Sequence, residues 1–372
     1  MKTIQNTTPS RQLGLTIIEL LIALTIGVFI IGGVAQIFVA TRYSTSITLA
    51  ENSMQENARF AFNRMTRLIQ KAGGFGCQAP EDGVSTSLLD FSEGTFRPWV
   101  GLEGWEARDT RFGHVYNFST DTQVTPSSQW LGHPDSELDT GVTASSQSDI
   151  LKIWYTDGAA GGLIAASATD LEFSEMDLQE SDLIALNDCR VTTFMQACEC
   201  DTHDGSGCNG TDTQVNIAPS SCNSPGNTSF NPLDLNDDTA SVHRVQQALF
   251  SVGEADIDGV TSLIIHGLGA DARLGEGREL VPGVENIQIR YGEDTNNDKS
   301  PNYYVSADEV GNWTKVVSVR LSLLMRSYRD NLTTGSQVIY FNGAKLDVPE
   351  GDTYLRRVFS TTISLRNRRI GY

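Results

Sequence analysis

The sequence is poor in the residues and motifs that most often carry catalysis. Its five histidines are scattered and show no catalytic spacing: His114, His133, His203, His243 and His266. It lacks a G-x-S-x-G nucleophile turn, an H-E-x-x-H metal motif and a Walker phosphate loop. Residues 267–272 match a loose dinucleotide pattern, but no helical periodicity follows them. The sequence therefore predicts that the protein is not an enzyme.

Basic residues are scarce in the middle of the chain. Residues 73–314 hold ten Lys and Arg against 39 Asp and Glu, a net charge of −29, whereas residues 315–372 carry +6. Such an acidic body repels phosphate backbones and anionic lipid headgroups. We therefore expect no nucleic-acid binding through the acidic part of the chain.

Charge is absent from one long apolar stretch near the N-terminus. Residues 20–41 are 22 residues without a charged side chain, and a helix of this length spans about 33 Å, which matches a bilayer core. The preceding residues hold Lys2 and Arg11 and no acid, so the positive-inside rule places the N-terminus in the cytoplasm. The pattern predicts a single membrane-spanning helix with everything after Arg42 beyond the membrane.

The junction before this stretch reads Gly14-Leu-Thr-Ile-Ile-Glu19. A secretory signal would be cleaved after its apolar region, but this junction precedes it. The order resembles the type IV prepilin motif. The resemblance implies that residues 1–14 are a leader, that a prepilin peptidase cleaves after Gly14, and that Leu15 becomes the methylated N-terminus.

Glu19 is a carboxylate at the edge of the apolar stretch. Burying it costs a few kcal/mol, roughly, even on insertion-based scales, so it is a candidate functional residue. Its natural partner is the α-ammonium group of Leu15 in a neighbouring subunit, because a buried charge is tolerated when it is paired. The alternative is that Glu19 snorkels to the membrane interface. Because Gly14 and the leader precede Glu19 so closely, we favour a role for Glu19 in subunit assembly.

The helix is expected to continue past the membrane. Residues 42–72 show apolar side chains at spacings of three and four, typical of an amphipathic helix, and Gly73 and Gly74 end it. Residues 15–41 would then be the transmembrane half and residues 42–72 the half that packs on a headgroup of residues 73–372.

The rest of the chain shows the period of β-strands. Residues 287–291, 317–323 and 359–365 alternate apolar and polar side chains as half-buried strands do, and residues 149–155 and 182–186 are shorter candidates. Two stretches, 79–148 and 201–238, are rich in turn residues and read as surface insertions. The predicted fold is α+β and type IV pilin-like, with a long helix packed on an antiparallel sheet.

Six cysteines all fall beyond the predicted membrane span: Cys77, Cys189, Cys198, Cys200, Cys208 and Cys222. In an oxidising compartment an even number favours disulfides, with fifteen possible pairings for six cysteines. Cys198, Cys200, His203 and Cys208 also allow a zinc site to be drawn. The C-x-C spacing is atypical for zinc, so we favour disulfides.

Three segments extend the resemblance to one family. Residues 55–77, 183–189 and 291–327 look like the PilW family of type IV pilus minor pilins. The family implies a minor pilin that joins other minor pilins, the major pilin and a tip adhesin at the inner-membrane assembly platform to prime pilus assembly. It also implies a periplasmic headgroup, and a place in the pilus or at its tip after assembly. Two alternatives are a type II secretion pseudopilin and a pilin-anchored adhesin or binding module.

The resemblance also bears on the disulfides. Cys77 follows the end of the helix and Cys189 follows a strand-like run, so a bond between them would tie the helix to the sheet. The four remaining cysteines, 198, 200, 208 and 222, would then form two local bridges in one exposed loop. The alternative is that Cys77 pairs into that loop instead.

An acidic stretch raises the question of a bound metal. Asp294, Asn296 and Asp298 alternate as calcium ligands do, with Asp308 downstream to complete a shell. Lys299 stands where an EF-hand requires glycine. Calcium is therefore a candidate cofactor and the sequence points to no other, while an acidic hairpin loop is the interpretation that we favour.

Overall fold

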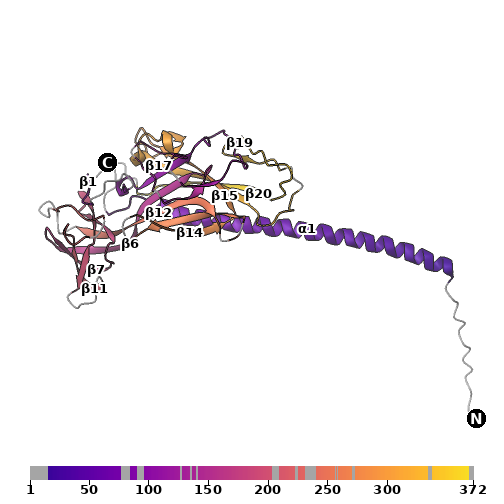
Figure 1. The fold of residues 1–372 in the computed structure, drawn as a ribbon, viewed down its shortest axis with the longest axis horizontal. Helices are drawn as coiled ribbons and strands as arrows, with labels where there is room; N and C mark the ends of the chain where they lie inside the picture. Colours follow the sequence, from indigo (N-terminus) through magenta and orange to yellow (C-terminus); the bar gives the residue numbers. More distant parts are fainter. Residues whose placement is uncertain are drawn as a thin grey trace, which may run out of the picture. The chain divides into compact units, whose positions relative to one another are not determined.

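The protein consists of a long N-terminal helix followed by mostly antiparallel β-sheets, an α+β, pilin-like architecture (Figure 1). The computed structural model describes residues 16–76, 84–89, 96–125, 128–134, 136–139, 141–202, 209–222, 225–230, 240–255, 257, 259–269, 273–333 and 337–367. Two compact units meet within the helix, one ending at Glu51 and the other beginning at Asn52. The second unit contains the headgroup.

The helix α1 spans Ile17–Ile69 and contains no proline. Its last turn tightens, because the N–H groups of Lys71 and Ala72 donate to carbonyls three residues back. Gly73 then takes a φ of 70°, which ends the helix. The predicted helix is confirmed, with its end three residues earlier than expected.

Among the described residues, twelve strands form the larger sheet. They are β1 (Val84–Ser87), β2 (Leu102–Ala107), β4 (Trp130–Leu131), β6 (Ile150–Ala166), β7 (Asp170–Asp177), β8 (Leu183–Asn187), β9 (Val191–Gln196), β10 (Glu199–Thr202), β11 (Asn209–Asn216), β12 (Ser241–Glu254), β13 (Thr261–Leu268) and β14 (Leu274–Pro282). The pairs are antiparallel except β1 with β9. β6, the longest strand, pairs with β2, β12 and β7.

A second, four-stranded sheet has the order β16-β15-β17-β20. Its strands are β15 (Val284–Glu293), β16 (Tyr303–Val305), β17 (Val316–Arg326) and β20 (Arg356–Ser364). There are also two small two-stranded sheets: β3 (Gln123–Val124) pairs with β5 (Ala144–Ser145), and β18 (Tyr340–Phe341) pairs with β19 (Ala344–Lys345). Short 3₁₀ turns lie at Pro98–Val100, Ala307–Glu309 and Trp313–Lys315.

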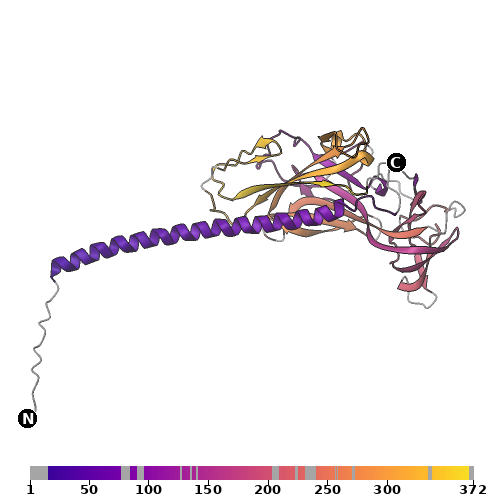
Figure 2. The ribbon, with the colours of Figure 1, turned by 180° about the vertical axis from the view of Figure 1, so that it is seen from behind.

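The C-terminal part of α1 packs on the headgroup, and both views show it beside β14 (Figures 1 and 2). Its buried side chains recur every three or four residues, as predicted for the amphipathic half: Met54, Ala58, Ala61, Met65 and Leu68. Asn57 Nδ2 donates to the carbonyl of Pro282 at 3.2 Å. The helix thus contributes an apolar stripe to the headgroup core.

The end of α1 is fixed on β6. The N–H of Gly73 donates to the carbonyl of Trp154 at 3.0 Å, and Thr156 Oγ1 donates to the carbonyl of Gly74 at 3.0 Å. Gly101 also has a positive φ, and a Cβ there would lie 2.8 Å from Gly73 Cα. Two glycines therefore allow the backbones to approach at this point.

Several strand predictions are confirmed. β20 alternates as expected, with Ile363 buried and its neighbours Thr362 and Ser364 exposed. β8 is shifted by one residue from its predicted range, and β6 begins at Ile150 but continues far beyond residue 155. β15 departs from a half-buried strand, because Asn286 and Gln288 on its polar face are also buried.

The prediction that two stretches are surface insertions is wrong in part. Residues 79–148 include β2, in which every residue is buried and which pairs with β6 inside the larger sheet. Residues 201–238 include β11, where Val215 is fully buried. The abundance of turn residues in this stretch predicted a surface segment, but even the charged residues Glu103 and Glu106 of β2 are buried.

Candidate assembly site

The N-terminal part of α1 contains Glu19, the residue predicted to act in subunit assembly. Among the described residues, α1 is the one helix long and apolar enough to cross a membrane. Its large apolar side chains are exposed, with Phe29 at 82% and Ile17 at 80% of full accessibility. Apolar surface of this extent is stable only when lipid or other protein covers it.

Glu19 closes a capping box at the start of α1. Its Oε2 accepts hydrogen bonds from the backbone N–H and the hydroxyl of Thr16, both at 3.0 Å, and its own N–H donates to Thr16 Oγ1 at 3.3 Å. Two amide groups at the helix start are satisfied in this way. The T-x-x-E spacing carries this signal, which the sequence analysis did not use. Gly14 and Leu15, the predicted processing positions, lie outside the described residues.

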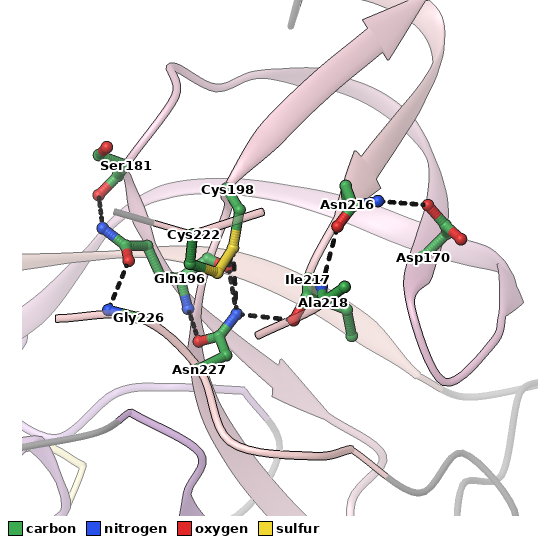
Figure 3. Close-up of a disulfide and its surroundings, with 10 residues drawn as sticks. All are labelled: Asp170, Ser181, Gln196, Cys198, Asn216, Ile217, Ala218, Cys222, Gly226 and Asn227. Atoms are coloured by element: carbon green, nitrogen blue, oxygen red, sulfur yellow. Dashed lines mark hydrogen bonds between the residues drawn. A yellow bond between two sulfur atoms is a disulfide. The ribbon is translucent and has the colours of Figure 1, made fainter. Parts of the chain in front are cut away.

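One disulfide is described, between Cys198 and Cys222, whose Cα atoms are 4.4 Å apart (Figure 3). Beside it the amide of Asn227 donates to the carbonyls of Gln196 and Ile217 at 2.8 and 3.0 Å. Cys198 and Cys222 are oxidised, so the zinc site that used Cys198 is wrong: a bonded sulfur has no thiolate to offer a metal.

The other cysteines are placed less fully. Cys189 is disulfide-bonded, and it lies two residues after the end of β8, close to the predicted position. Cys77 and Cys208 lie outside the described residues, and of Cys200 only the backbone, in β10, is described. The pairing of Cys77 with Cys189 stays a prediction.

The candidate calcium residues have other partners. The carboxylate of Asp294 accepts four backbone N–H groups, from Asn296, Asn297, Asp298 and Lys299, and so organises the loop itself. Asp308 forms an ion pair with Arg111 instead of joining that loop. In the part of the chain that the structure describes, no group of three or more His, Cys, Asp or Glu is placed to hold a metal. The arrangement is that of a turn-forming hairpin loop.

The two sheets meet at Asp149, just before β6. Its Oδ1 accepts the N–H of Ala107 in β2 at 3.0 Å, and its Oδ2 accepts the N–H of Ile289 in β15 at 2.7 Å. The carbonyl of Ile287 accepts the N–H of Asp149, and the N–H of Ile287 donates to Ser148 Oγ. Residues 148 and 149 thus provide hydrogen-bond partners for the backbone groups on the edge of β15 that β16 does not reach.

Two acids at this junction have strongly altered acidity. Burial, reinforced by the carboxylates of Asp149 and Asp308, raises the pKa of Glu106 to about 10. Burial also raises the pKa of Asp149, to about 7, although its two backbone N–H partners act in the opposite direction. Glu106 is therefore protonated at neutral pH. No local sequence pattern predicts this junction, because it arises from the register of three separate strands.

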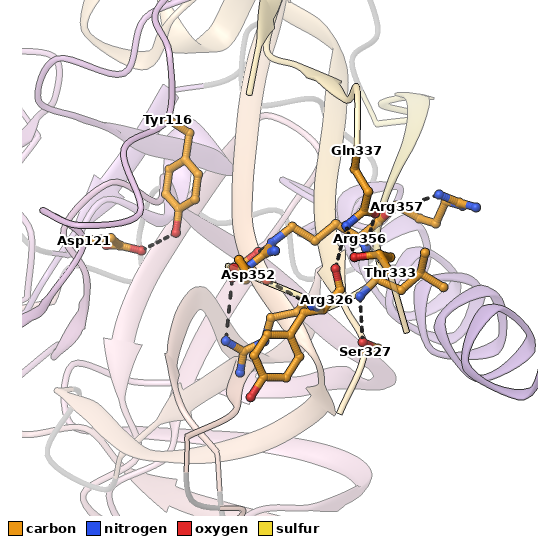
Figure 4. Close-up of polar contacts among 12 residues, drawn as sticks. Tyr116, Asp121, Arg326, Ser327, Thr333, Gln337, Asp352, Arg356 and Arg357 are labelled. Carbon is orange, nitrogen blue, oxygen red and sulfur yellow. Dashed lines mark hydrogen bonds and ion pairs between the residues drawn. The ribbon is translucent and has the colours of Figure 1, made fainter. Parts of the chain in front are cut away.

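A buried ionic cluster stabilises the four-stranded sheet. The guanidinium group of Arg356 forms two parallel hydrogen bonds to Glu285, at 2.6 and 2.9 Å, and an ion pair with Asp352 at 2.9 Å. Figure 4 shows Arg356 beside Asp352 and Arg326, with the side chain of Gln337 accepting the Arg356 N–H. The cluster joins β15, β20 and the segment between β19 and β20.

Comparison with known protein families finds one match, over the C-terminal third of the chain. Residues 250–367 match the family model PilW, described as Type IV Pilus-assembly protein W. The match runs from the end of β12 through β20 and includes the four-stranded sheet; of the three segments that resemble the family, it contains residues 291–327. No curated protein and no solved structure matches the chain. At residues 250–367 the chain therefore carries the domain of the PilW family of type IV pilus-assembly proteins.

Proposed function

We propose that this protein is a minor pilin that takes part in initiating type IV pilus assembly, within a priming or tip complex. The observation that carries the proposal is the combination of a PilW domain with an α1 helix whose apolar side chains are exposed from Ile17 onward. Such a helix supports both a membrane anchor and packing against the helices of other subunits.

Before assembly the chain is anchored in the inner membrane by one span, with its headgroup in the periplasm. A prepilin peptidase removes residues 1–14 and Leu15 is methylated. The partners are other minor pilins, the major pilin, the assembly platform and a tip adhesin. After assembly the protein belongs to the pilus or its tip.

Glu19 selects and aligns subunits in this proposal. In the isolated chain its carboxylate is held by Thr16. In the assembled helix bundle the α-ammonium group of a neighbouring Leu15 approaches the same carboxylate and neutralises it. Pairing of opposite charges offsets the cost of removing both from water.

A Glu19→Ala variant tests this function in a host strain lacking the wild-type gene. We expect normal membrane insertion, few pili, and loss of co-purification with other minor pilins. Glu56→Ala, which removes an exposed carboxylate from the headgroup half of α1, is the matched control and should behave as wild type. Normal pilus number and normal co-purification in Glu19→Ala would contradict the proposal. Pili unaffected by deletion of the gene, with secretion lost, would indicate a pseudopilin.

A further inference from the structure

Two arginines lie side by side on the open face of the four-stranded sheet. Arg290 in β15 is directly opposite Arg320 in β17. They line a depression of about 220 Å³, which we call the arginine hollow and define by Arg290, Arg320, Ser322, Ser360, Phe112 and Tyr340. Like charges directly across a strand pair destabilise a sheet. An arrangement of this kind requires compensation.

Aromatic rings supply part of that compensation. The guanidinium carbon of Arg290 lies 4.5 Å from the ring centroid of Phe112, and that of Arg320 lies 4.1 Å from the ring centroid of Tyr304. Among the residues that the structure describes, no carboxylate lies within ion-pair distance of either guanidinium group. Partial burial and the neighbouring charge of Arg320 lower the pKa of Arg290. The charges of Glu106 and Glu309 act on that pKa in the opposite direction, and Arg290 Nη2 also donates to the backbone carbonyl of Tyr304.

The rest of the hollow is suited to a ligand. Ser322 and Ser360 line it, and their hydroxyl groups are hydrogen-bonded to each other at 2.9 Å. Phe112 and Tyr340 stand at its rim with 58% and 68% of their surfaces exposed. The polar wall is fixed, because Asn342 Nδ2 donates to Gln288 Oε1 at 2.8 Å. A planar anion flanked by apolar groups matches these features.

We propose that the arginine hollow binds an aspartate or glutamate side chain presented by an acidic peptide segment of another pilus subunit. The partner's identity as a pilus subunit rests on the proposed function. Four of the six residues that define the hollow, Arg320, Ser322, Tyr340 and Ser360, lie in the basic segment 315–372 with its net charge of +6, which favours an anionic ligand. Residues 73–314, at −29, repel extended polyanions such as nucleic acid or an anionic lipid surface. A peptide segment with a single carboxylate carries much less negative charge than a polyanion, so the acidic part of the chain repels it only weakly. The exposed rings at the rim then contact its apolar neighbours.

The test measures peptide binding to the full-length protein in detergent micelles. The probe is Ac-Gly-Phe-Asp-Phe-Gly-NH2 carrying an uncharged dye, compared by fluorescence anisotropy with the same peptide containing Asn in place of Asp. We expect the Asn peptide to bind at least about tenfold more weakly, as loss of a charge-assisted hydrogen bond predicts. Arg320→Gln should weaken binding of the Asp peptide to the same extent, and added salt should weaken it further. Arg329→Gln, at an exposed arginine outside the hollow, is the matched control and should leave binding unchanged.

Melting curves separate binding from folding. Arg320→Gln removes one of two facing cations, so its melting temperature should equal or exceed that of the wild type. Arg320→Lys keeps the charge but loses the planar fork and should bind with intermediate affinity. Equal binding of the Asp and Asn peptides, equal effects of Arg320→Gln and Arg329→Gln, or binding of sialic acid with no binding of the Asp peptide would each overturn the proposal. Peptide binding is measured without pili, so failure of the Glu19 test leaves this result unaffected.

Discussion

Asp149 Oδ2 accepts the backbone N–H of Ile289 at 2.7 Å, and through this bond the larger sheet holds the edge of the smaller one. The other carboxylate oxygen accepts the N–H of Ala107. A single buried side chain therefore carries hydrogen bonds from both sheets. Asp149 is therefore one of the links between the four-stranded sheet and the larger sheet.

Replacing Asp149 by Asn should destabilise the headgroup. An amide has one oxygen, so its NH2 group would face one of the two backbone N–H groups and leave it without an acceptor. We expect a loss of about 1–3 kcal/mol in the free energy of unfolding, measured by urea denaturation. Asp109→Asn is the control, because Asp109 is exposed and asparagine tolerates its φ of 63°. Equal stability of the two variants would contradict the role of Asp149.

The stability of the headgroup should fall as the pH rises, in part because of Glu106. Its pKa is raised from 4.5 to about 10 on folding, so its contribution is fully present below pH 4.5 and is lost as the pH rises toward 10. Glu106→Gln cannot ionise. The difference in unfolding free energy between wild type and Glu106→Gln should therefore shift steadily against the wild type from pH 5 to pH 10. A constant difference would show that Glu106 titrates normally.

Thr16 and Glu19 can be tested separately. Thr16→Ala removes the hydroxyl of the capping box but keeps the Glu19 carboxylate, so we expect pili to form in near-normal number. Loss of such a cap costs about 1 kcal/mol of helix stability. Thr16→Ser retains the hydroxyl and is the conservative control. If Thr16→Ala abolishes piliation as completely as Glu19→Ala, the carboxylate acts mainly within its own helix.

After processing, the mature chain should begin at Leu15. Gly14→Val should block cleavage, because a β-branched side chain would crowd a peptidase pocket fitted to glycine. N-terminal sequencing of membrane-extracted protein gives the answer directly. A start at Met1 in the wild type, or after residue 40, would refute the prepilin interpretation.

The predicted Cys77–Cys189 bond closes a long loop, and in the entropy model such a bond contributes about 4 to 5 kcal/mol. Cys189→Ser should then lower the melting temperature more than Cys222→Ser, since the bond of Cys222 to Cys198 spans a sequence separation of 24. Non-reducing peptide mapping identifies the partners. A peptide containing Cys77 linked to any cysteine other than Cys189 would defeat the assignment.

Local patterns predicted the helix and the C-terminal strands well. The three- and four-residue spacing of Met54, Ala58 and Ala61 and the alternation around Ile363 reflect burial of one face, which a single segment reveals by itself. The PilW resemblance, supported by a match at residues 250–367, came from the same kind of local evidence.

Long-range pairing could not be predicted in this way. Residues 79–148 were predicted to be a surface insertion because they are rich in turn residues, but β2 within them pairs with β6, and its Glu103 and Glu106 are buried. Arg290 and Arg320 lie opposite each other because of the register between β15 and β17, and the sequence of neither strand alone reveals that register.

The attachment of α1 to β6 also determines how the protein bears tension. A pulling force on α1 reaches the headgroup through covalent continuity and through the bonds of Gly73 to Trp154 and of Thr156 to Gly74. Trp154 and Thr156 lie within the longest strand, and β12 pairs with β6 along this region. We expect a load that enters there to be shared among the backbone hydrogen bonds between β6 and β12, so that they do not open one at a time from a strand end.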